Sequence, residues 1–271
     1  MGLAIRLGAV LVLSVAACTE PPAPKHSEPS ARLVTPPPFV PRTYREGEKV
    51  VVPVTFPDGS TAEVVYAREL DLASRGVRPN TWALLDTSYG SVGRDFRIDP
   101  GRLEEVWRGD PIREYEGADG TVVPFLRAAG MDYLAFGFGA WTVSVYDYPG
   151  GGARLTEEER SLWARSLTGY ETEDGFLLLE AQPPLRLARA GEYPSPMELW
   201  FGGPDGGVEI RPVKKCSPKQ QFERSAGYAS WCDTEARMYI GVQGDKKFVD
   251  AALAGGVRVR NVVFAEEPVS K

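Results

Sequence analysis

The chain has 271 residues, 43% of them hydrophobic, so it is long enough to bury a core in one large domain or two small ones. Its net charge of −6 argues against nucleic-acid binding, because proteins that bind nucleic acids normally present a basic surface. The only histidine is His26, so histidine-based catalytic triads and histidine-built zinc sites are excluded from the region after it.

The N-terminus carries a short apolar run, residues 7–17, that ends directly before Cys18. Such a run is too short to span a bilayer, which needs roughly 20 residues. With small residues just ahead of Cys18, the pattern resembles the signal peptide and lipobox of bacterial lipoproteins, although Val15 replaces the preferred leucine. The resemblance implies that residues 1–17 are a cleaved signal peptide and that Cys18 carries lipid on the extracytoplasmic face of a cell membrane. The alternative is an ordinary signal peptide and a free secreted protein.

Residues 18–45 follow Cys18 and are rich in proline. Proline fixes φ and lacks an N–H group, so we expect an extended segment that forms neither helix nor strand ladder. It is interpreted as a semi-rigid tether between the lipid and the folded part. A docking site for a protein partner is the alternative.

A first unit is expected over residues 46–180. Runs of alternating apolar residues predict strands, and the turn at 57–59 predicts a hairpin. A helix is predicted over 156–167, because Thr156 and Glu159 have the spacing of a capping box.

The aromatic residues Tyr133, Trp141 and Tyr146 are concentrated in one part of this unit. If they were exposed, their rings could stack on sugar rings while the nearby Asp132 or Asp147 bonded hydroxyl groups. The alternative is that they fill a sheet core, where aromatic side chains bury large areas.

A second unit is expected over residues 181–267, with strands, a helix over 246–253 capped by Asp245, and a closing strand. With Cys18 assigned to lipid, Cys216 and Cys232 remain as a pair in an oxidising compartment, which predicts a disulfide. Two thiols at a metal site are the alternative.

Together these patterns predict an α+β fold, mostly antiparallel sheet with two late helices, arranged as two similar β-rich units with one helix each. No complete catalytic motif is found, and we expect no metal and no cofactor. The leading hypothesis is a non-catalytic binding or accessory module of the cell envelope, with an envelope protein as partner. A receptor for carbohydrate or another small ligand is the second hypothesis, and a hydrolase that uses two carboxylates is the third.

Overall fold

A computed structural model describes residues 32–88, 90–128, 130–147, 154–188, 197–203, 206–216 and 222–265. The expected signal peptide, the expected lipid site Cys18 and the first part of the expected tether lie outside these residues. None of the helices in the described ranges combines the length and apolar character that a bilayer crossing requires.

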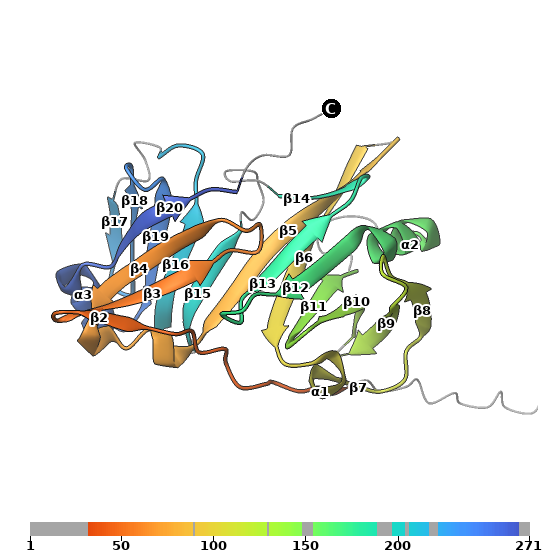
Figure 1. Cartoon of the computed structure of the whole chain (residues 1–271), viewed down its shortest axis with the longest axis horizontal. Helices are drawn as coiled ribbons and strands as arrows, with labels where there is room; N and C mark the ends of the chain where they lie inside the picture. The colour runs from red at the N-terminus through yellow and green to blue at the C-terminus, as the bar shows by residue number, and fades with distance from the viewer. Residues whose placement is uncertain are drawn as a thin grey trace, which may run out of the picture.

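A large antiparallel sheet runs through the whole molecule (Figure 1). In spatial order its strands are β17 (Phe222–Ser225), β18 (Tyr228–Asp233), β19 (Met238–Gly244), β16 (Gly206–Pro212), β15 (Glu198–Gly203), β5 (Val77–Thr87), β6 (Gly90–Pro100), β11 (Trp141–Tyr146), β10 (Met131–Phe138), β9 (Val122–Ala128) and β8 (Arg113–Glu116). The short strand β14 (Leu185–Leu187) also pairs with β5.

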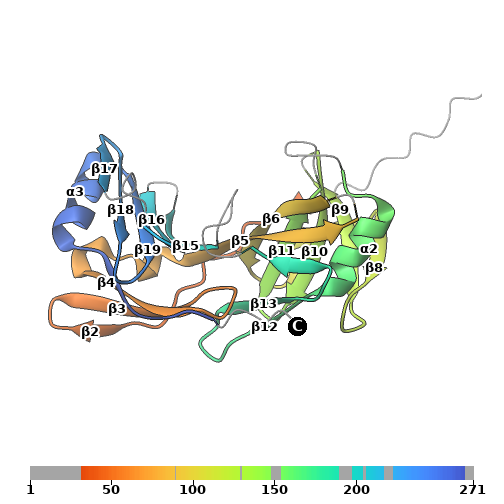
Figure 2. The same cartoon turned by 90° about the horizontal axis from the view of Figure 1, so that it is seen from above.

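A second layer covers one face of this sheet. It consists of a four-stranded sheet, β2 (Tyr44–Glu46), β3 (Lys49–Thr55), β4 (Thr61–Ala67) and β20 (Arg258–Val263), and a hairpin, β12 (Leu167–Glu171) and β13 (Leu177–Ala181). Both lie along the same side of the large sheet in Figure 2. The predicted hairpin at 57–59 is confirmed, since β3 pairs with β4 and the Phe56 amide donates to the Ser60 carbonyl at 2.8 Å.

The helices are few, and the prediction of a mostly antiparallel sheet is confirmed. They are α1 (Leu103–Val106), α2 (Glu157–Ser166) and α3 (Lys246–Gly255), with two 3-10 turns, η1 (Arg68–Leu70) and η2 (Ala73–Arg75). Helices α2 and α3 begin at the predicted caps, because Thr156 accepts from the Glu159 amide and Asp245 from the Phe248 amide. Helix α1 and the 3-10 turns are additional to the two expected helices.

Two hydrophobic cores lie side by side between the layers. One core joins residues such as Leu199 and Ile240 of the large sheet to Val64 of the four-stranded sheet and Val249 of α3. The other joins the large sheet to the hairpin and α2, where Phe96 and Trp163 meet edge to face at 5.9 Å. We call the face of the large sheet that these cores cover the inner face, and the opposite one the outer face.

The segment from Arg32 to Phe39, part of the expected tether, packs on the folded body. Strand β1 (Arg32–Leu33) pairs with β7 (Trp107–Arg108), which corrects the expectation that this stretch forms no ladder. Pro38 fits against Gly76, where a Cβ atom would lie 2.2 Å from the proline Cβ and φ is +82°. Residues 32–39 of the expected tether therefore belong to the folded structure.

Phe39, the last residue of this segment, packs between the two cores. Its ring contacts Trp141 at 5.3 Å and Phe176 at 5.1 Å between centroids, both edge to face. The Val77 amide donates to the Phe39 carbonyl at 2.8 Å. The side chain packs against both clusters, so it links the two halves of the molecule.

Strands from either side of residue 180 pair with one another. Strand β5 pairs with β14 and β15, and β4 pairs with β20, so the large sheet and the four-stranded sheet each contain strands from both expected units. The division into units 46–180 and 181–267 stays a prediction from the sequence.

Candidate binding face

The three aromatic residues singled out in the sequence lie on two different faces of the large sheet. Tyr133 and Tyr146 stand opposite each other on β10 and β11, with ring centroids 4.9 Å apart. Trp141 lies five residues before Tyr146 on the same strand, so the alternation of side chains places it on the inner face. These three rings therefore form no common patch.

Two of the three rings are core residues. Tyr133 is 2% exposed and packs on Trp107 at 4.9 Å, and Trp141 is 1% exposed. The expectation of a shared exposed stacking surface is wrong for these two residues. The alternative stated with it, that the rings fill a sheet core, describes them correctly.

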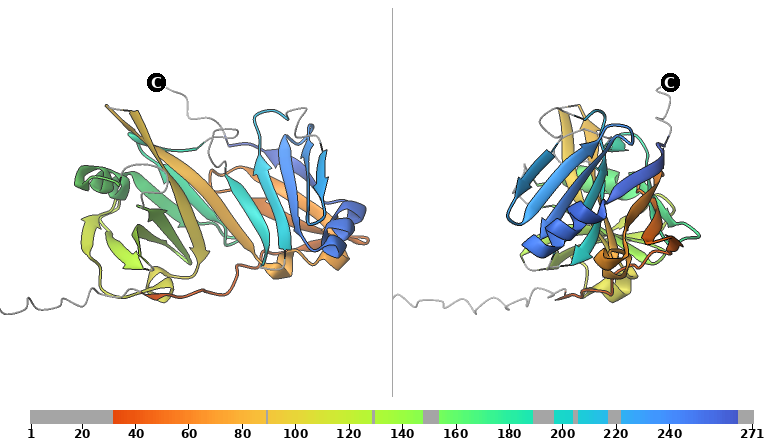
Figure 3. Two further views of the ribbon diagram at one scale, coloured as in Figure 1. Left: turned by 180° about the vertical axis from the view of Figure 1, so that it is seen from behind. Right: turned by 90° about the vertical axis from the view of Figure 1, so that its left-hand side faces the viewer.

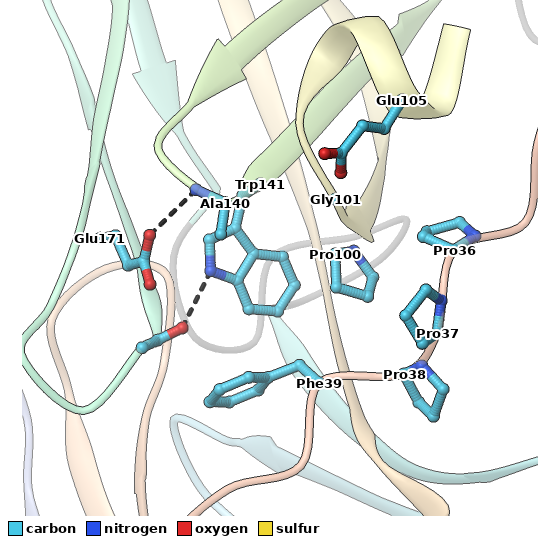
Figure 4. A pocket seen from close by; sticks show the side chains of 11 residues that line it. Pro36, Pro37, Pro38, Phe39, Pro100, Gly101, Glu105, Ala140, Trp141 and Glu171 are labelled. Carbon is cyan, nitrogen blue, oxygen red and sulfur yellow. Dashed lines mark hydrogen bonds between the residues drawn. The ribbon is translucent and has the colours of Figure 1, made fainter.

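A small pocket of about 240 Å³ opens beside Trp141. Figure 4 shows that the three consecutive prolines and Phe39 form one wall, while Trp141 and Glu171 lie across from them. The Trp141 indole donates to the Gly175 carbonyl at 2.9 Å, and the Ala140 amide donates to Glu171 Oε2 at 2.9 Å. These bonds hold the hairpin β12–β13 to the end of β10, so the pocket is first of all a structural junction.

Asp132 and Asp147, the expected partners of ligand hydroxyls, are buried in a structural network. Asp147 Oδ1 accepts from the Leu155 amide at 2.7 Å, and its Oδ2 pairs with Arg160 at 2.9 Å. Asp132 Oδ1 accepts from Arg127 Nε at 2.6 Å. These carboxylates fix the start of α2 and the β9–β10 pairing.

The predicted disulfide is present. Cys216 and Cys232 are bonded, with their Cα atoms 5.7 Å apart. The bridge ties the segment after β16 to β18, and Tyr239 and Val213 pack beside it. The pairing excludes the alternative of two thiols at a metal site.

The outer face carries a different set of polar and aromatic residues at its centre. Antiparallel register brings them together from five strands: Asn80 stands opposite Glu198 and Arg97, Trp200 opposite Glu209, and Arg211 opposite Tyr239. We call this set the outer-face cluster: Arg78, Asn80, Trp82, Asp95, Arg97, Glu198, Trp200, Glu209, Arg211 and Tyr239. In the view from behind (Figure 3, left), the strands that carry it lie in front of the second layer.

Two tryptophans of the outer-face cluster lie over glycines of the neighbouring strands. A Cβ atom at Gly93 would lie 2.0 Å from Cζ2 of Trp82, and one at Gly207 would lie 2.8 Å from Cζ2 of Trp200. Only glycine leaves room for an indole ring directly over the neighbouring strand. Both side chains are half-buried, so each ring is held by the sheet on one side and remains partly exposed.

Planar polar side chains lie on both sides of Trp200, on β5 and β15 towards Trp82 and on β16 and β19 away from it. Asn80 Nδ2 donates to Glu198 Oε1 at 3.1 Å. Arg211 pairs with Glu209, with 3.4 Å between Nε and Oε1, and its guanidinium lies over the Tyr239 ring at 4.0 Å. Amide, carboxylate and guanidinium groups supply both donors and acceptors along one line across the sheet.

Two carboxyl groups of this cluster, those of Glu209 and Asp95, hold their protons more tightly than usual. Burial, and next the charge of Glu198, raise the pKa of Glu209 to about 7. The same two causes raise the pKa of Asp95. Burial raises the pKa of Tyr239 to about 12. Glu198 therefore lies between two carboxyl groups that resist ionisation.

Comparison of the chain with protein-family models, with curated proteins and with solved structures finds no match. The site is therefore judged on its geometry alone.

Sequence patterns did not reveal the outer-face cluster. Asn80 and Glu198 are 118 residues apart, and their contact depends on the pairing of β5 with β15. One local signal was available, because Trp82 and Trp200 each occupy a polar-facing position of an alternating strand. A large aromatic residue at such a position is typical of a binding surface.

Proposed function

We propose that the protein is a lipid-anchored, non-catalytic binding module of the cell envelope and that it recognises carbohydrate through the outer-face cluster. The resemblance of residues 1–18 to a lipoprotein signal supports the anchor, and the disulfide is consistent with an exported protein. Carbohydrate is the ligand class of the second hypothesis drawn from the sequence. The residues now proposed to bind it are different ones.

The observation that carries this proposal is the pair of partly exposed indoles that lie over glycines of the neighbouring strands. A pyranose has an apolar face of C–H groups and a rim of hydroxyls. A flat, partly exposed indole packs against such a face, since aromatic side chains combine a large apolar surface with specific ring geometry. Trp82 and Trp200 each supply such a surface, on strands that also carry Asn80 and Glu198.

The polar groups around the indoles fit the rest of the ligand. Hydroxyl groups both donate and accept hydrogen bonds, so they match a line of amide, carboxylate and guanidinium groups better than a flat apolar partner would. The alternative prediction is that the partner is an envelope protein. Binding of a protein would not require flat aromatic rings.

Calorimetric titration of the full lipidated chain in nanodiscs with chitotetraose, cellotetraose and maltotetraose tests this function. We expect at least one saccharide to bind, and the substitutions Trp82→Ala and Trp200→Ala to weaken it by about tenfold each. Tyr170→Ala is the matched control, because Tyr170 is 51% exposed on β12, in the second layer. Absence of binding to all three saccharides, or equal weakening by the control, would overturn the proposal.

A carboxylate-based hydrolase is the second candidate, favoured by one observation. Glu198 and Glu209 lie on adjacent strands, and the pKa of Glu209, about 7, suits a general acid. Release of new reducing ends from the bound tetrasaccharide, lost in Glu209→Gln, would establish the hydrolase. If the saccharide stayed intact after prolonged incubation, the binding module would stand and the hydrolase would be rejected.

A further inference from the structure

The indole of Trp200 is bordered by two carboxyl groups. Glu209 stands directly opposite Trp200 on the neighbouring strand, and Glu198 precedes Trp200 by two residues, so all three side chains share the outer face. Glu198 is positioned by the amide of Asn80 at 3.1 Å. Glu209 Oε2 lies over Gly241, where a Cβ atom would come within 3.2 Å of it.

The titratable and charged groups on the same face as Glu209 come from five strands. Arg211 lies on its own strand, Glu198 on β15, Tyr239 on β19, and Arg78 and Asp95 on β5 and β6 respectively. Arg211 interacts with two groups, because its guanidinium pairs with Glu209 and also lies over the Tyr239 ring. Glu209 thus has beside it one guanidinium, which also lies over a tyrosine ring, and a second carboxyl group, Glu198, which favours a single negative charge on the pair of carboxyl groups.

We propose that Glu198 and Glu209 form a proton-controlled hydrogen-bonding pair that grips two neighbouring hydroxyls of a pyranose stacked on Trp200. This inference rests on the proposed carbohydrate-binding function. With one proton on the pair, Glu209 donates to a hydroxyl oxygen while Glu198 accepts from the next hydroxyl. The site then binds a vicinal diol, whose two hydroxyls supply one acceptor and one donor.

The proton is lost close to neutral pH, since the pKa of Glu209 is about 7. Above that pH the pair has two acceptors and no donor, and the two carboxylates repel each other. Affinity for the saccharide should therefore fall as the pH rises through about 7. A lost hydrogen bond in a half-buried site corresponds to about a tenfold change in affinity.

The test measures the dissociation constant of each of the three tetrasaccharides at pH 5.5 and pH 8.5. We expect the wild-type protein to bind about tenfold more weakly at pH 8.5. Glu209→Gln keeps a donor and cannot ionise, so its affinity should not depend on pH. Glu180→Gln, at an exposed carboxylate on β13, is the control and should follow the wild type.

The outcomes separate this inference from the function on which it rests. Binding that requires Trp82 and Trp200 but is equal at both pH values would overturn the inference and leave the function. If the affinity of Glu209→Gln for the saccharide fell between pH 5.5 and pH 8.5 as much as that of the wild type, the inference would also be overturned. A direct readout is the carbon-13 titration of the Glu209 carboxyl group in the free protein: a midpoint near 7 supports the inference, and one near the ordinary value of glutamate contradicts it.

Discussion

The environment of Glu209 opposes its charge. Its side chain is 23% exposed, it faces a second carboxyl group, and its guanidinium partner also lies over a tyrosine ring. A surface strand has no structural need for a carboxyl group at such a place, since glutamine would fit the same space. Residues that cost stability in this way are commonly kept for binding or catalysis.

The raised pKa of Glu209 makes stability depend on pH in a defined direction. The folded protein binds this proton more tightly than the unfolded chain, so the stabilisation is complete below the ordinary pKa of glutamate and is lost as the pH rises to about 7. Allowing for partial exposure, Glu209→Gln should raise the free energy of unfolding by on the order of 1–2 kcal/mol at pH 8, relative to its effect near pH 4.

Urea denaturation of wild type and Glu209→Gln at both pH values measures this difference. Glu180→Gln serves again as the exposed control and should show none of it. A Glu209→Gln variant with the same pH profile as the wild type would show that the carboxyl group ionises normally in the folded protein.

At the scale of elements, helix α2 begins at a reciprocal cap. Thr156 Oγ1 accepts from the Glu159 amide at 3.2 Å, and Glu159 Oε2 accepts from the Thr156 amide at 2.7 Å. Thr156→Ala should lower the free energy of unfolding by about 1 kcal/mol in thermal or urea denaturation. Thr156→Ser keeps the hydroxyl and should remain within a few tenths of the wild type. Equal losses in both variants would mean that the hydroxyl does not carry the effect.

Elements with local signals could be predicted, whereas those that depend on distant pairing could not. The caps at Thr156 and Asp245 and the turn at 57–59 are encoded within four residues, and the structure contains all three. The alternation in β11 shows that its side chains have two faces, but not which strands lie beside it. The outer-face cluster and the docking of Phe39 both depend on such long-range neighbours, so neither could be predicted from local patterns in the sequence.

For the whole molecule, one sheet supports two cores, and the proline-rich segment links them. Phe39 touches the aromatic rings of Trp141 and Phe176 and packs against both cores. The packing of the two cores against each other is therefore coupled to this segment.

Phe39→Ala should lower the free energy of unfolding by about 2 kcal/mol, less than the value for a fully buried phenylalanine because the ring is only partly buried. It should also expose residues 32–43 to limited proteolysis. Val40→Ala is the neighbouring control, since Val40 is 56% exposed. If cleavage in this segment is as slow in Phe39→Ala as in the control, Phe39 does not hold it in place.

The central claim is that the outer face binds carbohydrate, and the six tryptophan indoles report on it directly. Nitrogen-15 spectra of the indole N–H groups would be recorded as chitotetraose, cellotetraose or maltotetraose is added. The account predicts saturable shifts for Trp82 and Trp200 with at least one saccharide, while Trp163, which is 0% exposed in the core, stays in place. Shifts confined to Trp141 beside the pocket, or no shift at Trp82 and Trp200 with any of the three, would contradict it.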